Sequence, residues 1–184
     1  AGDRAVVTLR QATERYPNNR RTYVALGRVR LEVAQVQSDR IELNKALEAL
    51  EKAVAEEQTS ESCMLLGRAL LLASEPEPAE RLLRQATAKL PADPLAFYYL
   101  ADAAERRAHF DVARQALVDY IALAGDEPDA RRRAGLALRV ADLSMRVKDY
   151  PFAVVWYERA APGFTGDTSV LVRQAEARWR AGQP

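Results

Sequence analysis

The sequence predicts an all-α protein, because of the spacing of its apolar residues, its lack of strand patterns and the placement of its prolines and glycines. Apolar residues recur three and four apart, as at Ala46, Leu47, Leu50, Ala53 and Val54, which is the spacing of one helix face. The alternating pattern of half-buried strands is nearly absent. Seven of the nine prolines, together with two glycines, fall in short breaks at 16–19, 75–78, 90–94, 125–128 and 161–163. We therefore expect helices of about three to five turns that end at these breaks.

The composition excludes several functional classes. The chain has 184 residues, 48% of them hydrophobic and 29% charged, which argues against a disordered tail or an ordinary membrane span. Its 27 basic and 26 acidic residues leave a net charge of +1, so we expect no nucleic-acid partner and no direct membrane insertion. The single cysteine, Cys63, and the single histidine, His109, leave little material for metal sites or catalytic triads. We find no phosphate loop, HExxH helix or GxSxG elbow, and we expect no catalysis, cofactor or metal.

A helix-pair pattern occupies residues 60–93. Its signature positions hold Cys63, Leu66, Gly67, Leu70, Ala79, Leu83, Ala86 and Pro91. This spacing resembles the tetratricopeptide repeat, a helix-turn-helix unit of about 34 residues that opens with W-x2-L-G-x2-Y. The same frame continues without a gap through Phe97, Leu100, Ala101, Ala104, Ala113, Leu117 and Tyr120. The two aromatic positions of the first unit depart from the signature.

The resemblance covers essentially the whole chain and implies a right-handed α-solenoid, a superhelix of antiparallel helix pairs. We expect one solenoid over 1–184. Its parts are the second half of a truncated repeat (1–19), a repeat with two helices each lengthened by about a turn (20–59), a regular repeat (60–93), a repeat plus an extended linker (94–133), another repeat (134–167) and a closing helix (168–184). The extra length of the fourth unit is expected before its first helix, around 126–133. The start inside a unit suggests a segment of a larger protein.

Small residues occupy one equivalent point on the successive first helices. They are Gly27, Gly67, Ala101, Ala141 and Ala175. A large side chain there would push the two helices of a unit apart, at a cost of about 1 to 3 kcal/mol from overpacking.

The resemblance also implies where a partner binds, because ligand contacts in this family come from set positions on the first helices that line the concave groove. The candidate partner-binding residues are Arg28, Met64, Arg68, Tyr98, Tyr99, Asp102, Arg106, Arg139, Asp142, Arg146 and Arg173. Arginines beside apolar and aromatic anchors suit an acidic-hydrophobic peptide or protein. In the alternative interpretation, Arg68, Asp102, Arg139 and Asp142 neutralise one another as ordinary surface ion pairs.

The Lys and Asn clamp of the chaperone-binding members is absent, because Val24 and Arg28 stand at its positions in the leading unit. A chaperone-tail receptor is therefore disfavoured.

Several conspicuous residues have simpler interpretations. Cys63 stands at the signature tryptophan position, where we expect a buried and inert thiol. We expect His109 in an exposed turn. Trp156 is predicted to pack, whereas Trp179 either packs or stays uncovered at a groove position. The arginine run 131–133 follows Asp126, Glu127 and Asp129 and is predicted to be a solvated, locally neutralised helix start.

These observations predict a noncatalytic scaffold for protein–protein interaction. The alternative is an accessory repeat region of a larger bacterial envelope, exopolysaccharide-export or secretion protein, or of an enzyme whose catalytic domain lies elsewhere. The excess of arginine over lysine and the abundance of alanine are typical of bacteria with GC-rich genomes. We also expect weak self-association through the ends of the solenoid, around 5–16 and 170–180, where apolar helix faces lack neighbours.

Overall fold

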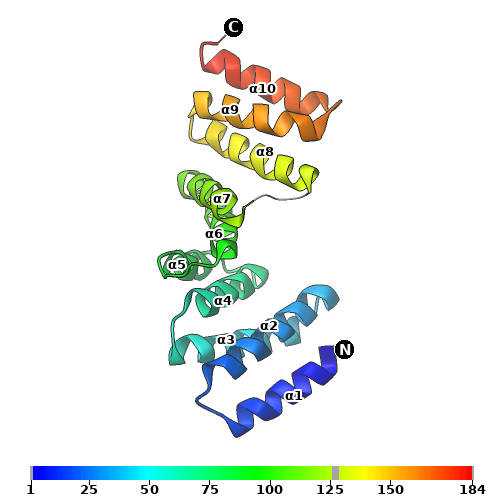
Figure 1. The fold of residues 1–184 in the computed structure, drawn as a ribbon, viewed down its shortest axis with the longest axis vertical. Helices are drawn as coiled ribbons and strands as arrows, with labels where there is room; N and C mark the ends of the chain where they lie inside the picture. Colours follow the sequence, from blue (N-terminus) through cyan, green and yellow to red (C-terminus); the bar gives the residue numbers. More distant parts are fainter. Residues whose placement is uncertain (1, 126–128, 184) are drawn as a thin grey trace. The chain divides into compact units, whose positions relative to one another are not determined.

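The computed structural model describes residues 2–125 and 129–183, and every regular element in that part of the chain is helical (Figure 1). The elements in order are α1 (Gly2–Arg15), α2 (Arg20–Gln37), α3 (Arg40–Glu56), α4 (Ser60–Leu72), α5 (Pro76–Thr87), α6 (Pro94–Arg106), α7 (Phe110–Ala124), α8 (Ala130–Arg146), α9 (Tyr150–Ala160), a short 3-10 helix η1 (Ala161–Phe164) and α10 (Thr168–Arg180). The all-α prediction is confirmed. The chain divides into two compact units, Ala1–Ala103 and Ala104–Pro184, so the division falls inside α6.

The first unit is built from helices that pack in sequence order. Helix α2 packs against α1 and α3, α3 packs against α4, and α4 packs against α5. Helices α2 and α3 have 18 and 17 residues, whereas α4 and α5 have 13 and 12. The two helices within 20–59 are thus longer than the next pair by about a turn.

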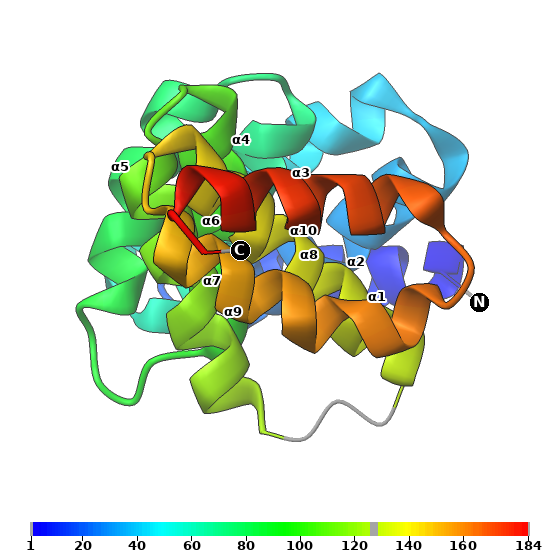
Figure 2. The ribbon, with the colours of Figure 1, turned by 90° about the horizontal axis from the view of Figure 1, so that it is seen from above.

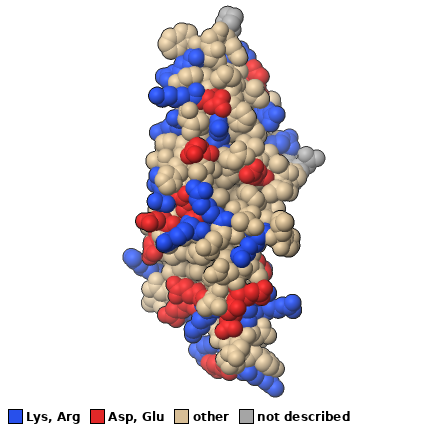
Figure 3. Space-filling model, turned by 90° about the vertical axis from the view of Figure 1, so that its left-hand side faces the viewer, with Lys and Arg blue, Asp and Glu red and all other residues tan. Residues whose placement is uncertain are grey.

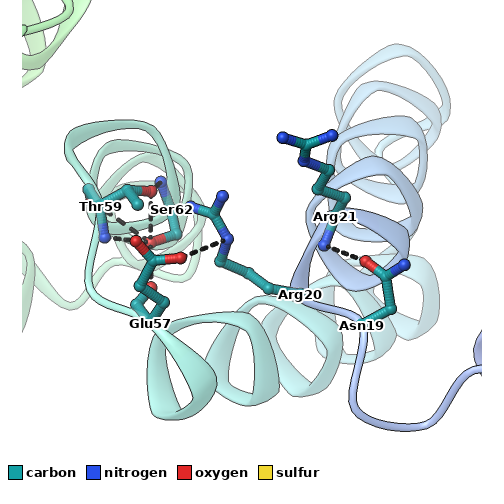
Figure 4. Close-up of polar contacts among 6 residues, drawn as sticks. All are labelled: Asn19, Arg20, Arg21, Glu57, Thr59 and Ser62. Carbon is teal, nitrogen blue, oxygen red and sulfur yellow. Dashed lines mark hydrogen bonds and ion pairs between the residues drawn. The ribbon is translucent and has the colours of Figure 1, made fainter.

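Local side-chain contacts define where helices of the first unit begin (Figure 4). The side chain of Asn19 accepts a hydrogen bond from the amide of Arg21 at 3.0 Å and caps α2. Thr59 and Ser62 form a reciprocal capping box at the start of α4. Such caps satisfy amide groups that have no partner inside the helix. Arg20 pairs with Glu57 at 3.2 Å, which links the start of α2 to the end of α3.

The tightest packing between paired helices occurs where a glycine faces a leucine. A Cβ placed on Gly27 would lie 2.5 Å from Cγ of Leu50, and one placed on Gly67 would lie 2.5 Å from Cγ of Leu83. Both leucines are completely buried. The two glycines therefore let the first and second helices approach until a leucine side chain rests on the bare backbone.

The second unit has α8 at its centre. Helix α8 packs against α7 and α9, and α10 packs against α9, beside which it lies in both views (Figures 1 and 2). The 3-10 helix η1 packs against α8, where a Cβ placed on Gly163 would lie only 2.2 Å from that of Ala134.

The predicted position of the extra length in this unit needs a correction. Helix α8 has 17 residues and begins at Ala130, so residues 130–133 form an additional helical turn rather than a linker before the helix. Asp129 explains this start, because its carboxylate accepts hydrogen bonds from the amides of Arg131 and Arg132 and so caps the added turn. The rest of the predicted extension, 126–128, lies outside the described residues.

The glycine contact provides a stability test. Replacing Gly67 with leucine would overpack the contact with Leu83, and we expect the protein to lose about 2 kcal/mol of stability, or roughly 6 °C in Tm for a chain of this size. The matched control is Gly135→Ala, since Gly135 lies in α8 and a Cβ placed on it would have no atom within 4 Å. That change should raise the stability by about 0.5 to 1 kcal/mol through helix propensity. Thermal melts followed by circular dichroism measure both effects, and an undiminished Tm for Gly67→Leu would contradict the close contact.

Candidate functional site

Arg68, Tyr98 and Tyr99 form a cluster on α4 and α6, which are the first helices of two successive repeats. All three residues lie in the first compact unit. The guanidinium of Arg68 lies 5.7 Å from the centre of the Tyr99 ring, and Tyr98 meets Tyr99 edge-on with ring centres 5.5 Å apart. Arg68 also donates a hydrogen bond to the amide oxygen of Gln35 on α2. Burial raises the pKa of the Tyr99 phenol, and the nearby Arg68 partly offsets that rise. All three cluster residues are half-buried, so each keeps part of its surface accessible.

The other predicted residues of this unit lie in different environments. Arg28 on α2 is exposed and forms an ion pair with Glu61 on α4. Asp102 is half-buried and has contacts of its own within the chain. Met64 is only 4% exposed, so it packs in the core and offers almost no surface to a partner.

A shallow cavity of about 470 Å³ in the second unit contains three of the predicted residues, Arg139, Asp142 and Arg146. Arg139 pairs with Glu105 through its Nε and Nη2 atoms, at 2.7 and 2.6 Å. Arg146 is exposed, and its guanidinium lies 5.3 Å from the centre of the Phe110 ring. The cavity therefore combines one neutralised arginine with one that rests on an aromatic face.

Phe110 and Gly135 also line this cavity, although the sequence did not point to them. Phe110 begins α7, which is the second helix of its repeat. The rule that ligand contacts come from set positions on the first helices, here called the positional rule, does not consider second helices. The other predicted residue near the start of this unit, Arg106, is exposed and has contacts within the chain.

Asp142 connects α8 to the two helices that follow. Its Oδ1 accepts a hydrogen bond from the hydroxyl of Tyr157 at 2.7 Å, and its Oδ2 accepts one from Arg173 at 2.9 Å. Tyr157 is only 1% exposed. Burial, followed by the hydrogen bond and negative charge of Asp142, raises the pKa of the Tyr157 phenol. The Asp142 carboxylate is thus held in place by one neutral and one charged donor.

Polar contacts between first helices recur at about one repeat length. The partners are Arg28 and Glu61 (33 residues apart), Gln35 and Arg68 (33), Glu105 and Arg139 (34), and Asp142 and Arg173 (31). On the face in Figure 3, lysine and arginine side chains likewise stand among aspartate and glutamate side chains. Charges therefore pair across neighbouring helices, as the alternative interpretation expects, and the contacts join Arg139 to Glu105 and Asp142 to Arg173. Exposed pairs of this kind stabilise a fold by about 0 to 1 kcal/mol each.

The remaining conspicuous residues mostly match their simpler interpretations. Cys63 is fully buried, and burial raises the pKa of its thiol, so the prediction of a buried cysteine is confirmed. Trp156 is buried, whereas Trp179 is 77% exposed. The run 131–133 is exposed at the start of α8, as expected. His109 differs from expectation, because it is half-buried at the cap of α7 and has contacts within the chain.

The described residues include neither a cluster suited to a metal ion nor a helix suited to span a membrane. No group of three or more His, Cys, Asp or Glu side chains in that part of the chain is placed to hold a metal ion. Among the same residues, no helix has the length and apolar character needed to cross a bilayer.

The terminal helices expose apolar side chains, namely Val7 on α1 and Leu171, Val172 and Trp179 on α10. Self-association through these faces stays a prediction.

Solved structures place this helical arrangement in a known fold. MamA is 21% identical, with 86% of this chain and 80% of that chain covered at a TM-score of 0.70. YrrB, described as a TPR protein with an unusual peptide-binding site, is 14% identical over 95% of this chain and 84% of that chain, at a TM-score of 0.72. A thermophilic TPR protein from Thermus thermophilus is 19% identical over 97% of this chain and 91% of that chain, at a TM-score of 0.58.

These similarities show that the chain has the tetratricopeptide-repeat fold, an α-solenoid of helix pairs. No protein-family model matches the sequence, and no curated protein matches it either. The resemblance recognised from the repeat signature is therefore confirmed at the level of the fold.

The contact between Tyr157 and Asp142 predicts a pH-dependent stability. Tyr157→Phe removes this hydrogen bond, so we expect a loss of about 1 kcal/mol at pH 7, or roughly 3 °C in Tm. The folded pKa lies above the unfolded value of about 10. The contribution of Tyr157 is therefore complete below that pH and is lost as the pH rises further. Stability should accordingly fall less steeply above pH 10 in Tyr157→Phe than in the wild type.

Tyr150→Phe is the matched control on α9, because the Tyr150 hydroxyl makes only a 3.4 Å contact with Arg180. Denaturant titrations between pH 7 and 11 compare the three proteins. Parallel pH profiles for Tyr157→Phe and the wild type would show that the buried phenol does not govern this dependence.

Proposed function

We propose that the chain is a noncatalytic scaffold that binds a protein or peptide along its first helices. The cluster of Arg68, Tyr98 and Tyr99 carries this proposal, because it combines two aromatic rings with a cation on adjacent first helices. Partly buried tyrosine and arginine side chains are the residue types that dominate binding energy at protein interfaces. The description of YrrB as a protein with a peptide-binding site supports the same use of this fold.

The chemistry of Arg68 favours an acidic group on the partner. Its partners in the described part of the chain, the Gln35 amide and the Tyr99 ring, are both neutral, so no carboxylate cancels its charge. A carboxylate on the partner can accept from the remaining N–H groups without breaking an existing ion pair. Tyr98 and Tyr99 would meanwhile contact apolar groups beside that carboxylate. The expected ligand is an acidic segment that also carries apolar side chains.

The second unit offers a similar combination at its shallow cavity. Arg146 rests on Phe110, whereas Arg139 is neutralised by Glu105. We therefore assign the attraction for acidic groups at this cavity to Arg146, and we assign to Arg139 and Glu105 a polar wall that accepts and donates hydrogen bonds. Whether one partner engages both units does not alter the assignment within either unit.

Substitutions in the first unit test the proposal once a partner has been isolated by affinity capture on the full chain. Tyr98→Ala removes an aromatic anchor, and we expect a loss of about 2 kcal/mol in binding, or roughly thirty-fold in Kd. Arg68→Glu should weaken the binding of an acidic partner by a similar factor, because it replaces attraction with repulsion. Isothermal titration calorimetry with the purified partner measures both changes.

Arg81→Glu is the matched control. Arg81 is exposed on the second helix α5, and its substitution changes the net charge by the same amount as Arg68→Glu. We expect this variant to bind within two-fold of the wild type. Circular dichroism must show equal helix content in all variants. If the partner tolerates both first-helix changes but loses affinity for Arg81→Glu, it binds the second helices and the proposed surface is wrong.

A further inference from the structure

A second cavity, of about 650 Å³, lies among α7, α8 and α9 of the second unit. Its apolar lining includes Tyr120 and Ile121 from α7, Leu136 from α8 and Trp156 from α9. Its charged lining consists of Arg132 and Arg133 from the start of α8 and Arg159 from α9. None of these residues belongs to the first-helix surface proposed above, and two of the three helices are second helices.

The additional turn of α8 builds one wall of this cavity. Arg132 and Arg133 lie in that turn, and Leu136 follows one turn later. The turn is fixed at its start by the Asp129 cap and on another side by η1, where Gly163 lies against Ala134. A first helix as short as α4, with 13 residues, has no such turn. This wall is therefore formed by a capped and packed helical turn that the regular repeat lacks, and not by a fraying helix end.

The charge of the cavity has one sign among the described lining residues, which include three arginines and no carboxylate. Arg132 and Arg133 have other contacts within the chain, so the argument depends on Arg159. Its guanidinium lies 4.5 Å from the centre of the Trp156 ring, and its side chain is exposed. Stacking on an indole holds the guanidinium plane in position while leaving its in-plane N–H groups directed away from the ring.

We infer that this cavity binds an acidic peptide segment. An apolar side chain of the segment enters against Ile121, Leu136 and Trp156, and a neighbouring carboxylate pairs with Arg159. Both parts of the lining are needed for this assignment. A phosphate-rich polyanion would pair with Arg159 but leave the apolar surface uncovered, and a purely apolar segment would bring no carboxylate to Arg159.

Intrinsic fluorescence tests the inference, because the chain has two tryptophans and Trp156 lines the cavity. Trp179→Phe, at an exposed position, leaves Trp156 as the only reporter. The probe is the acetylated and amidated peptide Asp-Leu-Asp-Phe-Asp. Its controls are Asn-Leu-Asn-Phe-Asn, which lacks the charges, and Asp-Ser-Asp-Ser-Asp, which lacks the apolar groups. We expect a saturable change in Trp156 emission with the probe and a Kd at least about ten-fold lower than with either control.

Charge reversal localises the binding. Arg159→Glu should raise the Kd for the probe by about ten-fold or more, and Arg159→Gln should raise it by less. Arg131→Glu is the matched control, since Arg131 stands beside Arg132 in the same turn but is not among the lining residues. It should change Kd by less than about two-fold, because an exposed charge outside the cavity acts only through a screened field.

Four results would overturn the inference. These are no saturable signal at millimolar probe, equal binding of either control peptide, an equal effect of Arg131→Glu and Arg159→Glu, and tighter binding of inorganic tripolyphosphate than of the probe. The test is separate from that of the first-helix surface, because Arg68→Glu and Tyr98→Ala should leave the affinity for the probe unchanged. Equal helix content by circular dichroism is required of every variant.

Discussion

The close approach of paired helices is the constraint on which the rest of this structure depends. Gly27 and Gly67 each leave room for a completely buried leucine, Leu50 or Leu83, directly against the backbone of the first helix. This contact sets how near the two helices of a pair lie, and the pairs then stack at that spacing. Side chains on successive first helices consequently come within reach of one another about one repeat apart, as Arg28 and Glu61 do. The polar contacts between first helices are thus a result of the apolar packing and contribute little to it.

Much of the fold follows from the sequence because the repeat signature encodes this packing. The small residue, the buried leucine and the breaks recur at fixed spacing, so the lengthened helices α2 and α3 were predictable from a signature that arrives late. The additional turn of α8 was predicted only in part, because the run 131–133 was expected to begin a helix while the extra length of the unit was expected to precede that helix. Periodicity reports a helix only where one face is buried, and residues 131–133 are exposed. The local signal for that turn is Asp129, whose carboxylate caps the helix in addition to neutralising nearby arginines.

The candidate site was predictable in position but not in detail. The positional rule brought Arg139, Asp142 and Arg146 to one cavity, because equivalent positions on a helix point the same way. It failed for Met64, which is buried, since the rule treats every first helix as equally exposed. It also omitted Phe110 and Gln35, which hold Arg146 and Arg68 in place. Contacts between residues about 33 positions apart in the sequence depend on the length and rotamer of each side chain. The spacing of residues within one helix predicts neither of these.

Six arginines of the candidate site and of the cavity among α7, α8 and α9 fall into two groups with different capacities for recognition. Arg28, Arg139 and Arg173 are paired with carboxylates of the same chain, so a partner must first displace Glu61, Glu105 or Asp142 to use their charge. Arg68, Arg146 and Arg159 instead lie over aromatic rings, which orient the guanidinium without cancelling its charge. An incoming carboxylate gains the full charge-assisted hydrogen bond only from the second group. In a chain whose charges nearly balance at +1, the preference for acidic partners that we propose therefore depends on the ring-stacked arginines rather than on the total number of basic residues.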